Sequence, residues 1–192
     1  DEVDANKNPT GKRVTTNDYD SADYYYINKS SLPKVYGGFN TSLSWKGFDL
    51  SAIFAYSIGG YIYNRDITMI LHNGSLEGRD WSTEILKRWT PDNRYTDVPA
   101  LSTTSNDWNS ASTRFLQNNS YMRLKNLTLS YNLPKQWISK LSLSSVQVYV
   151  QGDNLFTIHR NQGLDPEQGI TGITYYRYPA MRTISGGINV SF

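Results

Sequence analysis

The sequence predicts an all-β chain whose strands, about five in number, belong to a transmembrane β-barrel larger than the chain itself. Three observations lead to this prediction. Five segments alternate apolar with polar residues at a period of two. The links between these segments alternate between long and short. The polar positions hold mainly Ser, Thr, Asn, Gln and Gly, which suits a wet, crowded lumen better than a surface in bulk water.

The first two alternating segments predict a hairpin over residues 35–64. One segment runs from Val35 to Lys46, and the next begins at Phe48 after a turn at Lys46-Gly47. We expect the second strand to extend through Gly59-Gly60 to about Asn64.

Residues 121–192 are predicted to hold the last three strands. These strands cover Tyr121 to Leu133, Ser145 to about Phe156, and Arg182 to Phe192. Their apolar sides carry residues that recur at every second position: Leu127, Leu129, Tyr131, Leu133, Val146, Val148, Val150, Ile184, Ile188, Val190 and Phe192.

The links between strands alternate in length. Residues 1–34, 65–120 and 157–181 are long, whereas 46–47 and 134–144 are short. Membrane barrels alternate in this way because their periplasmic turns are short and their extracellular loops are long. A Greek-key sandwich has no reason to alternate. We therefore expect the three long links to be extracellular and the last strand to end in the periplasm.

Two of the links carry helical patterns. Residues 81–89 place Ile85, Leu86 and Trp89 at helical spacing, which predicts a short amphipathic helix within the second long loop. One helical turn is predicted over 135–140, directly after a proline.

Aromatic side chains are predicted to form a girdle at the periplasmic ends of the strands. Trp45, Phe48, Tyr131 and Phe192 lie at these ends on the apolar face, where we expect them at one level of the membrane interface. The alternative is that these residues belong to the core of a sandwich.

Composition excludes several classes of protein. The hydrophobic share of 38% and the mean hydropathy of −0.56 resemble a soluble protein, but a barrel strand needs only every second residue apolar. The absence of cysteine excludes disulfide scaffolds and cysteine-ligated zinc. With two histidines and a net charge of +2, we expect no metal, no cofactor and no nucleic-acid partner.

The acidic residues do not predict an enzyme. Asp165 and Glu167, near Arg160 and Arg177, lie two residues apart in a loop, which does not establish the carboxylate separation of a glycosidase. The acidic start of the chain, Asp1 to Asn6, includes Glu2 but lacks the Gly and the distal Glu of a calcium-binding loop. We therefore expect no catalytic residues and no metal ligands.

Aromatic residues and one arginine in the long links are candidates for ligand contact. Aromatic faces suit sugar stacking, and a guanidinium suits hydroxyl contacts. The same side chains suit loop packing or the docking of a protein partner. The candidates are Trp81, Trp108, Tyr175, Tyr176, Arg177 and Tyr178.

Five strands do not close a membrane barrel, whose smallest members have about eight. An open sheet edge inside lipid leaves backbone groups without hydrogen-bond partners. The remaining strands are therefore expected outside this chain, which begins at Asp1 without an initiator Met and is expected to be a processed or truncated product.

Several motifs, in order along most of the chain from Tyr24 onward, resemble the SusC/RagA family of TonB-dependent transporters. They are LPKVYGGFNTSLSWKGFDLSAIFAYSIGGYIYN (32–64), WTPDN (89–93), TDVP (96–99), SYMRLKNLTLSYNLP (120–134), GDNL (152–155), GLDP (163–166) and RTISGGINVSF (182–192).

The resemblance implies a barrel of about 22 strands around a plug, in the outer membrane of Bacteroidetes-type bacteria. It implies import of glycans or peptides with a SusD-like surface lipoprotein, powered by TonB through an N-terminal region absent here. The chain is then the C-terminal segment of the barrel domain. Phe192 resembles the terminal signal read by the barrel-assembly machinery.

The rival hypothesis is a secreted or surface-attached β-sandwich that binds carbohydrate. A barrel presents its apolar face outward to lipid, whereas a sandwich buries that face between two sheets. Seven residues separate the two hypotheses: Trp45, Phe48, Leu50, Phe54, Leu129, Val148 and Ile188.

Overall fold

The structure is a computed structural model that describes residues 4–6, 8, 10–12, 14, 16, 18–74, 76, 78–102, 107–161, 163, 165–167 and 169–192. Asp1 and Glu2, considered above for calcium, lie outside the described residues, as does Leu164 of the 163–166 motif. The chain forms two compact units, each described by itself below. The loop unit holds residues 1–29 and 64–116, and the sheet unit holds residues 30–63 and 117–192.

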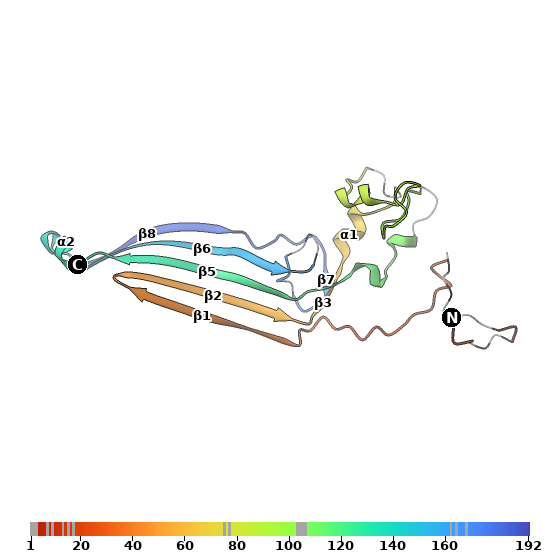
Figure 1. The fold of residues 1–192 in the computed structure, drawn as a ribbon, viewed down its shortest axis with the longest axis horizontal. Helices are drawn as coiled ribbons and strands as arrows, with labels where there is room; N and C mark the ends of the chain where they lie inside the picture. Colours follow the sequence, from red (N-terminus) through yellow and green to blue (C-terminus); the bar gives the residue numbers. More distant parts are fainter. Residues whose placement is uncertain are drawn as a thin grey trace. The chain divides into compact units, whose positions relative to one another are not determined.

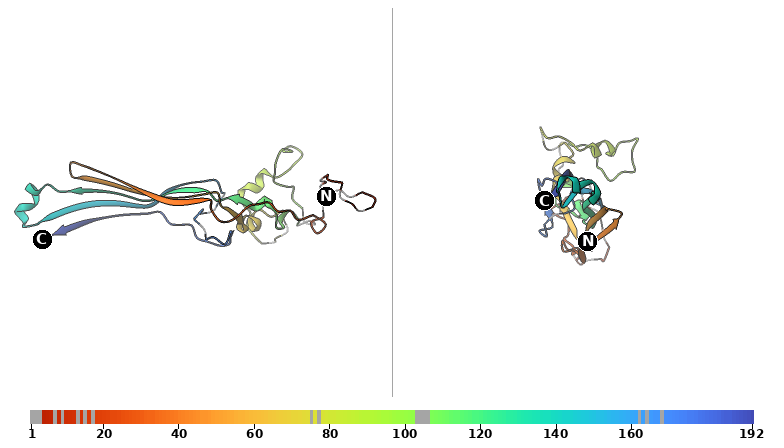
Figure 2. Two further views of the ribbon diagram at one scale, coloured as in Figure 1. Left: turned by 90° about the horizontal axis from the view of Figure 1, so that it is seen from below. Right: turned by 90° about the vertical axis from the view of Figure 1, so that its left-hand side faces the viewer.

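The main element of the sheet unit is a sheet of five strands. They are β1 (Val35–Trp45), β2 (Phe48–Ile58), β5 (Tyr121–Asn132), β6 (Ser145–His159) and β8 (Thr183–Ser191). Their order is β1-β2-β5-β6-β8, and every neighbouring pair is antiparallel. Figure 1 shows them side by side in a single layer, and the second orientation in Figure 2 shows that this layer twists. The predicted all-β fold with about five antiparallel strands is confirmed.

Both short links lie at one end of this sheet. Lys46 and Gly47 both have positive φ, at 48° and 89°, as a two-residue hairpin turn requires. The link between β5 and β6 contains α2 (Lys135–Ile138) and the 3₁₀ turn Ser139–Leu141, where one helical turn was predicted. Figure 1 places α2 and the C-terminus at the same end of the sheet.

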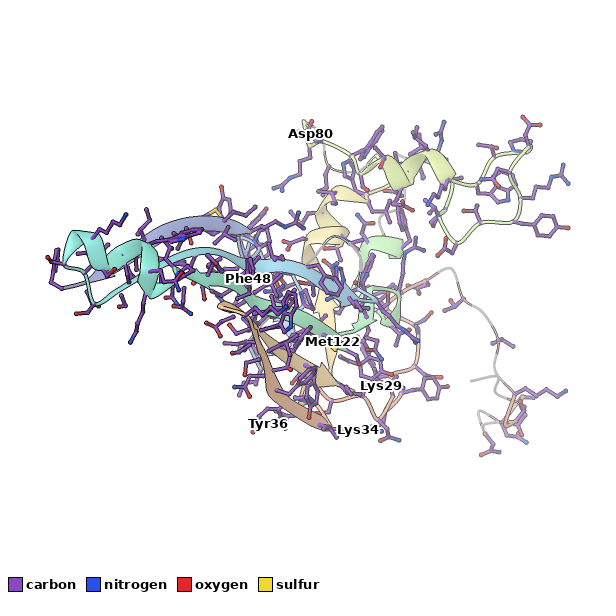
Figure 3. The ribbon with its side chains drawn as sticks, turned by 60° about the vertical axis from the view of Figure 1, so that its left-hand side comes forward. Lys29, Lys34, Tyr36, Phe48, Asp80 and Met122 are labelled. Carbon is purple, nitrogen blue, oxygen red and sulfur yellow. The ribbon has the colours of Figure 1, made fainter. Side chains whose placement is uncertain are left out.

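One face of the five-stranded sheet is apolar and exposed. Pairing aligns Trp45, Phe48, Tyr131, Val148 and Ile188 in one row across the five strands. Side chains project from both sides of the strands (Figure 3). Of the seven residues that separate barrel from sandwich, six are 40–65% exposed and Phe54 is partly exposed. The sheet therefore does not bury this face in a closed core of its own.

The opposite face carries a layer of hydrogen bonds between polar side chains. Asn132 donates to Asp49 at 2.7 Å across β5 and β2. Asn126 donates to Asp153 at 2.8 Å across β5 and β6. Gln147 donates to Ser130 at 3.3 Å and accepts from an amide of β8 at 3.2 Å. Neighbouring strands are thus connected through small polar groups, as in a wet lumen.

A β-bulge changes the alternation within β5. Leu124 and Asn126 pair with consecutive positions of β2, Phe54 and Ile53, so Lys125 is the extra residue. On the N-terminal side of the bulge, the odd-numbered residues of β5 lie on the polar face, and Arg123 pairs with Ala55 of that face.

A second, smaller sheet contains β3 (Tyr61–Asn64), β4 (Leu116–Asn118) and β7 (Ile173–Thr174), in the order β4-β3-β7. The sequence predicted one strand from Phe48 to about Asn64. Instead β2 ends at Ile58, because Gly59 adopts φ of 95° and turns the chain away from the main sheet.

The loop unit has a small apolar core. Leu71, Ile85 and Val98 are buried together, and Ile67 and Trp108 pack against them. Its longest helix, α1 (Arg65–Ile70), was not predicted; the Asn64 side chain caps it by accepting from the Ile67 amide. The helix predicted over 81–89 is a 3₁₀ helix, Thr83–Lys87, capped by Ser82. Two further 3₁₀ turns cover Asp107–Asn109 and Thr113–Phe115.

No helix among the described residues has the length and apolar character needed to cross a membrane.

Candidate functional site

In the loop unit, Trp81 is held by a buried histidine. Its indole N–H donates to Nδ1 of His72 at 3.0 Å, and the two rings lie 5.3 Å apart. The amides of Gly74 and Leu76 also point at Nδ1, at 3.3 and 3.4 Å. With three donors directed at it, Nδ1 acts as an acceptor. Trp81 is nevertheless 46% exposed, so one part of its ring remains open.

Trp108 contributes to packing in the same unit. It lies against the apolar core, and the Arg114 guanidinium is 4.7 Å from its ring centroid. The roles of Trp81 and Trp108 in ligand contact remain predictions.

In the sheet unit, the four other predicted contact residues are consecutive and exposed. The rings of Tyr175 and Tyr176 lie 4.1 Å apart at 46°. Tyr176 has φ of 50°, which bends the chain at this point. Arg177 is exposed and Tyr178 is 98% exposed.

Three of the four predicted girdle residues form one row. Trp45 pairs with Phe48, which pairs with Tyr131 at a ring distance of 4.5 Å. Phe192, 91% exposed, lies four positions beyond Ile188, the β8 residue of that row. Barrel strands tilt by about 35–45°, so a row across the strands is not a level in the membrane. The common level of all four residues remains a prediction.

An ion cluster on the polar face was not predicted. Arg123 donates to Asp165 at 2.5 Å, to Glu167 at 2.8 Å and to Thr157 at 2.9 Å. Lys125, at the bulge, donates to Glu167 at 2.6 Å. The side chains of Arg123 and Asp165 are 4% and 6% exposed. We call these four charged residues the clamp, because they join the loop after β6 to strand β5.

The clamp fixes both the charge and the position of Asp165. Burial pushes the pKa of Asp165 upward, but the amides of Ala180 and Glu167 and the Arg123 guanidinium together hold this pKa below its ordinary value. The carboxylates considered above as an acid pair are therefore bound to Arg123 and Lys125. The signal for this arrangement is the change of apolar phase in β5, from Met122 and Leu124 to Leu127 and Leu129.

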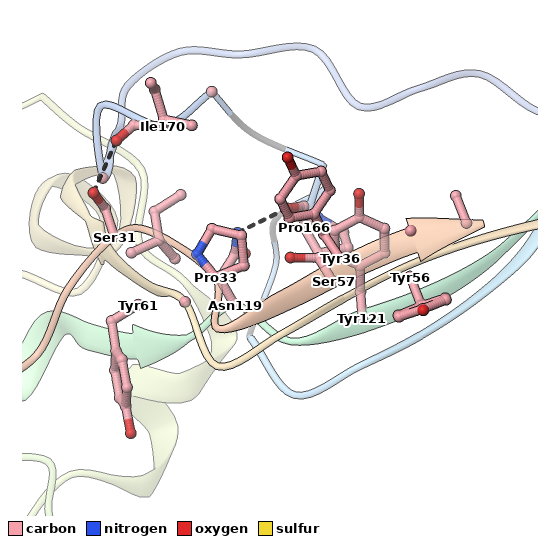
Figure 4. A pocket seen from close by; sticks show the side chains of 16 residues that line it. Ser31, Pro33, Tyr36, Tyr56, Ser57, Tyr61, Asn119, Tyr121, Pro166 and Ile170 are labelled. Atoms are coloured by element: carbon pink, nitrogen blue, oxygen red, sulfur yellow. Dashed lines mark hydrogen bonds between the residues drawn. The ribbon is translucent and has the colours of Figure 1, made fainter.

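Next to the clamp lies a cavity of about 290 Å³, which we call the tyrosine pocket. Tyr36, Ser57 and Tyr121, from the ends of β1, β2 and β5, form one side, and the loop after β6 contributes Pro166 and Ile170 (Figure 4). The lining includes no Asp, Glu, Lys or Arg among the residues that the structure describes.

Hydrogen bonds hold the loop over the tyrosine pocket. The side-chain amide of Asn119 donates to the Pro166 carbonyl at 2.9 Å. The Ser31 hydroxyl donates to the Ile170 carbonyl at 2.8 Å. Asn161 in turn donates to Asn119 at 2.8 Å. The pocket wall is thus fixed at several points before any ligand binds.

Across the described part of the chain, no three His, Cys, Asp or Glu side chains gather where they would hold a metal ion.

No family model matches the chain, but individual known proteins do. It is 34% identical over 166 residues to the TonB-dependent receptor P3 of Formosa agariphila, covering 81% of this chain and 16% of that protein. It is 29% identical over 174 residues to the TonB-dependent receptor SusC of Bacteroides thetaiotaomicron, covering 90% of this chain and 16% of SusC.

Solved structures match as well. The RagAB peptide importer in its closed-closed state superposes with a TM-score of 0.81 at 36% identity, covering 100% of this chain and 20% of that chain. Its open-open state gives 0.75 at 36% identity, covering 86% of this chain and 18% of that chain. The chain thus spans a fifth or less of the length of these relatives.

Proposed function

Because the chain belongs to the SusC/RagA family of TonB-dependent receptors, as a fragment of the barrel, we propose that it forms part of the wall of an importer. The importer takes up glycans or peptides across the outer membrane of a Bacteroidetes-type bacterium and is powered by TonB. One observation carries this proposal. One face of the five-stranded sheet is apolar and exposed, and on the opposite, polar face side-chain hydrogen bonds connect neighbouring strands. Such a sheet suits a wall between lipid and a watery lumen.

The links give the wall its proposed orientation. With the short links and Phe192 in the periplasm, the long links at the other end are extracellular. A SusD-like surface lipoprotein then docks on those long links. The candidate contact residues Trp81, Trp108, Tyr175, Tyr176, Arg177 and Tyr178 lie in the same links, where they meet substrate or that lipoprotein.

The two edge strands of the sheet indicate where the rest of the barrel would pair with this chain. The outer edges of β1 and β8 are the positions for the other barrel strands, because unpaired backbone groups are costly inside lipid. The plug fills the lumen, and TonB acts through the N-terminal region. Phe192, exposed after β8, is the residue that the barrel-assembly machinery reads.

We propose no catalytic role for the chain. The relatives are named receptors and an importer, and Asp165 and Glu167 are held by Arg123 and Lys125.

Growth of the native host tests the proposed function. In-frame deletion of the full-length receptor gene should abolish growth on one glycan or peptide pool, and inactivation of TonB should give the same loss. Removal of Phe192 should lower the amount of receptor in the outer membrane. Unchanged growth of the deletion strain on every glycan and peptide pool supplied would contradict the proposal.

A further inference from the structure

We propose that the tyrosine pocket binds one or two neutral sugar units of an imported glycan, which rests on the import function proposed above. The pocket lies on the polar face of the sheet, which in the barrel faces the lumen. Its volume of about 290 Å³ is at the small end of the range for ligand pockets, so it suits a short stretch of a chain and not a whole polymer.

The available hydrogen-bonding groups are hydroxyls. Within the described part of the chain, the side-chain hydroxyls of Tyr36, Ser57 and Tyr121 form no hydrogen bond. Each is both a donor and an acceptor and rotates to suit its partner. Sugar hydroxyls have the same dual character, so three such groups match a sugar better than a ligand with only acceptors.

Two tyrosine rings supply the apolar part of the site. Tyr36 and Tyr121 lie on the same side of the strands, whereas Tyr56 lies on the other side (Figure 4). Tyr36 is 76% exposed, so its ring is open to an arriving ligand. A ring face packs on the C–H surface of a sugar while the phenol oxygen reaches the sugar's hydroxyl edge.

The charge of the surroundings favours a neutral ligand. No charged residue lines the described part of the pocket. Beside it, the clamp pairs Arg123 and Lys125 with Asp165 and Glu167, and these four charges sum to zero. Arg177 approaches from outside the lining, 3.7 Å from the position that a Cβ would take at Gly169. Within the lining itself, a charged group would leave water without meeting a counter-charge.

Peptide recognition has no matching feature in this pocket. Extended peptides are commonly bound by adding a strand to an open sheet edge, where the backbone supplies the hydrogen bonds. Here Ser57 and Tyr121 belong to β2 and β5, which are both paired on each side. Tyr36 belongs to β1, whose outer edge is the position for the next barrel strand.

Binding to the full-length receptor, purified with its native partner, tests this inference. The probes are neutral oligosaccharides (maltohexaose, cellohexaose, laminarihexaose and xylohexaose), an acidic oligogalacturonate and a capped neutral hexapeptide. We expect at least one neutral oligosaccharide to bind, and Tyr36→Ala with Tyr121→Ala to weaken its affinity about tenfold or more.

Matched variants separate the pocket from a general loss of structure. Tyr26→Ala with Tyr95→Ala removes two exposed tyrosines outside the pocket and should leave the affinity unchanged. Tyr36→Phe with Tyr121→Phe keeps both rings and should weaken binding less than the alanine pair. A heat-dependent shift in gel mobility shows that each variant is folded.

Three results would overturn the inference: no neutral oligosaccharide binds, the acidic or peptide probe depends on the two tyrosines instead, or the control pair weakens binding equally. A measurement of TonB-dependent uptake distinguishes these three results from a failure of the import function. If TonB-dependent uptake occurs and is unaffected by the pocket variants, only the pocket assignment fails. If the wild-type receptor shows no TonB-dependent uptake of any substrate, the import function itself fails.

Discussion

The sheet and the loop unit place their apolar side chains in opposite ways. In the sheet, Leu50, Leu129 and Val150 follow one another across three strands and are each at least 40% exposed. In the loop unit, Leu71 and Ile85 are no more than 8% exposed and pack on each other. The loop unit therefore has a small apolar core of its own, as a globular domain in water does. The sheet behaves as a wall whose apolar face requires a solvent that is itself apolar.

The largest effect is expected from breaking the clamp. Arg123→Gln leaves Asp165 buried without its cation, and removing one partner of a buried ion pair costs about 3–5 kcal/mol. Hydrogen exchange should show loss of protection in residues 165–180 of the full-length receptor. Lys125→Gln is the matched control, because its pair with Glu167 is about a third exposed and contributes under about 1 kcal/mol. Equal effects of the two variants would contradict the clamp.

The next effect separates the two faces of the sheet. Leu129→Arg places a charge on the apolar face and should destabilise the receptor in lipid vesicles by about 2 kcal/mol or more, depending on depth. Thr128→Arg, one residue away on the polar face, should cost much less. Urea unfolding in vesicles measures both variants. A larger loss for Thr128→Arg would reverse the assignment of the faces.

A truncation in each unit sharpens the comparison. Ile85→Ala should lower the free energy of unfolding of the loop unit by about 2 kcal/mol, because it leaves a cavity in a small core. Leu129→Ala should cost under about 1 kcal/mol, because lipid tails occupy the space that the leucine leaves. Hydrogen exchange reports the first and vesicle unfolding the second. Comparable losses at the two sites would indicate that the sheet face is covered by protein.

The smallest effect concerns pH. The folded-state pKa of Asp165 is lowered, so its contribution to stability is complete above the unfolded value of about 3.9 and is lost as pH falls through the folded value. A nitroxide on Met181→Cys should therefore report an unchanged loop between about pH 8 and 5 and a mobile loop only in stronger acid. Mobility that begins near pH 6 would place the controlling charge elsewhere.

Much of the sheet was predictable from sequence because period-two alternation and link length are local properties. The bounds of β1, β5 and β8 agree with the predicted segments to within about a residue, and both short links lie where expected. The break at Gly59 was missed because residues typical of strands, Tyr61, Ile62 and Tyr63, follow the two glycines while the pairing partner changes.

The clamp and the tyrosine pocket were less predictable from the sequence. Arg123 and Asp165 are 42 residues apart, and no sequence spacing indicates that they meet. The bulge at Lys125 did leave a trace, since apolar residues change from even to odd positions along β5. Tyr36 and Tyr121 come together only through the strand order, which a single sequence does not specify. The loop core likewise depends on contacts between segments far apart in the chain.

The central claim is that the apolar face of the sheet meets lipid and the polar face meets water. Spin labels test it directly when they are placed one at a time at residues 127–132 of the full-length receptor in vesicles, with any cysteine outside this chain replaced. This chain itself contains no cysteine. We expect oxygen, which concentrates in lipid, to reach labels at Leu127, Leu129 and Tyr131. A water-soluble nickel reagent should reach the even positions instead. Absence of this alternation, or the reverse phase, would contradict the account.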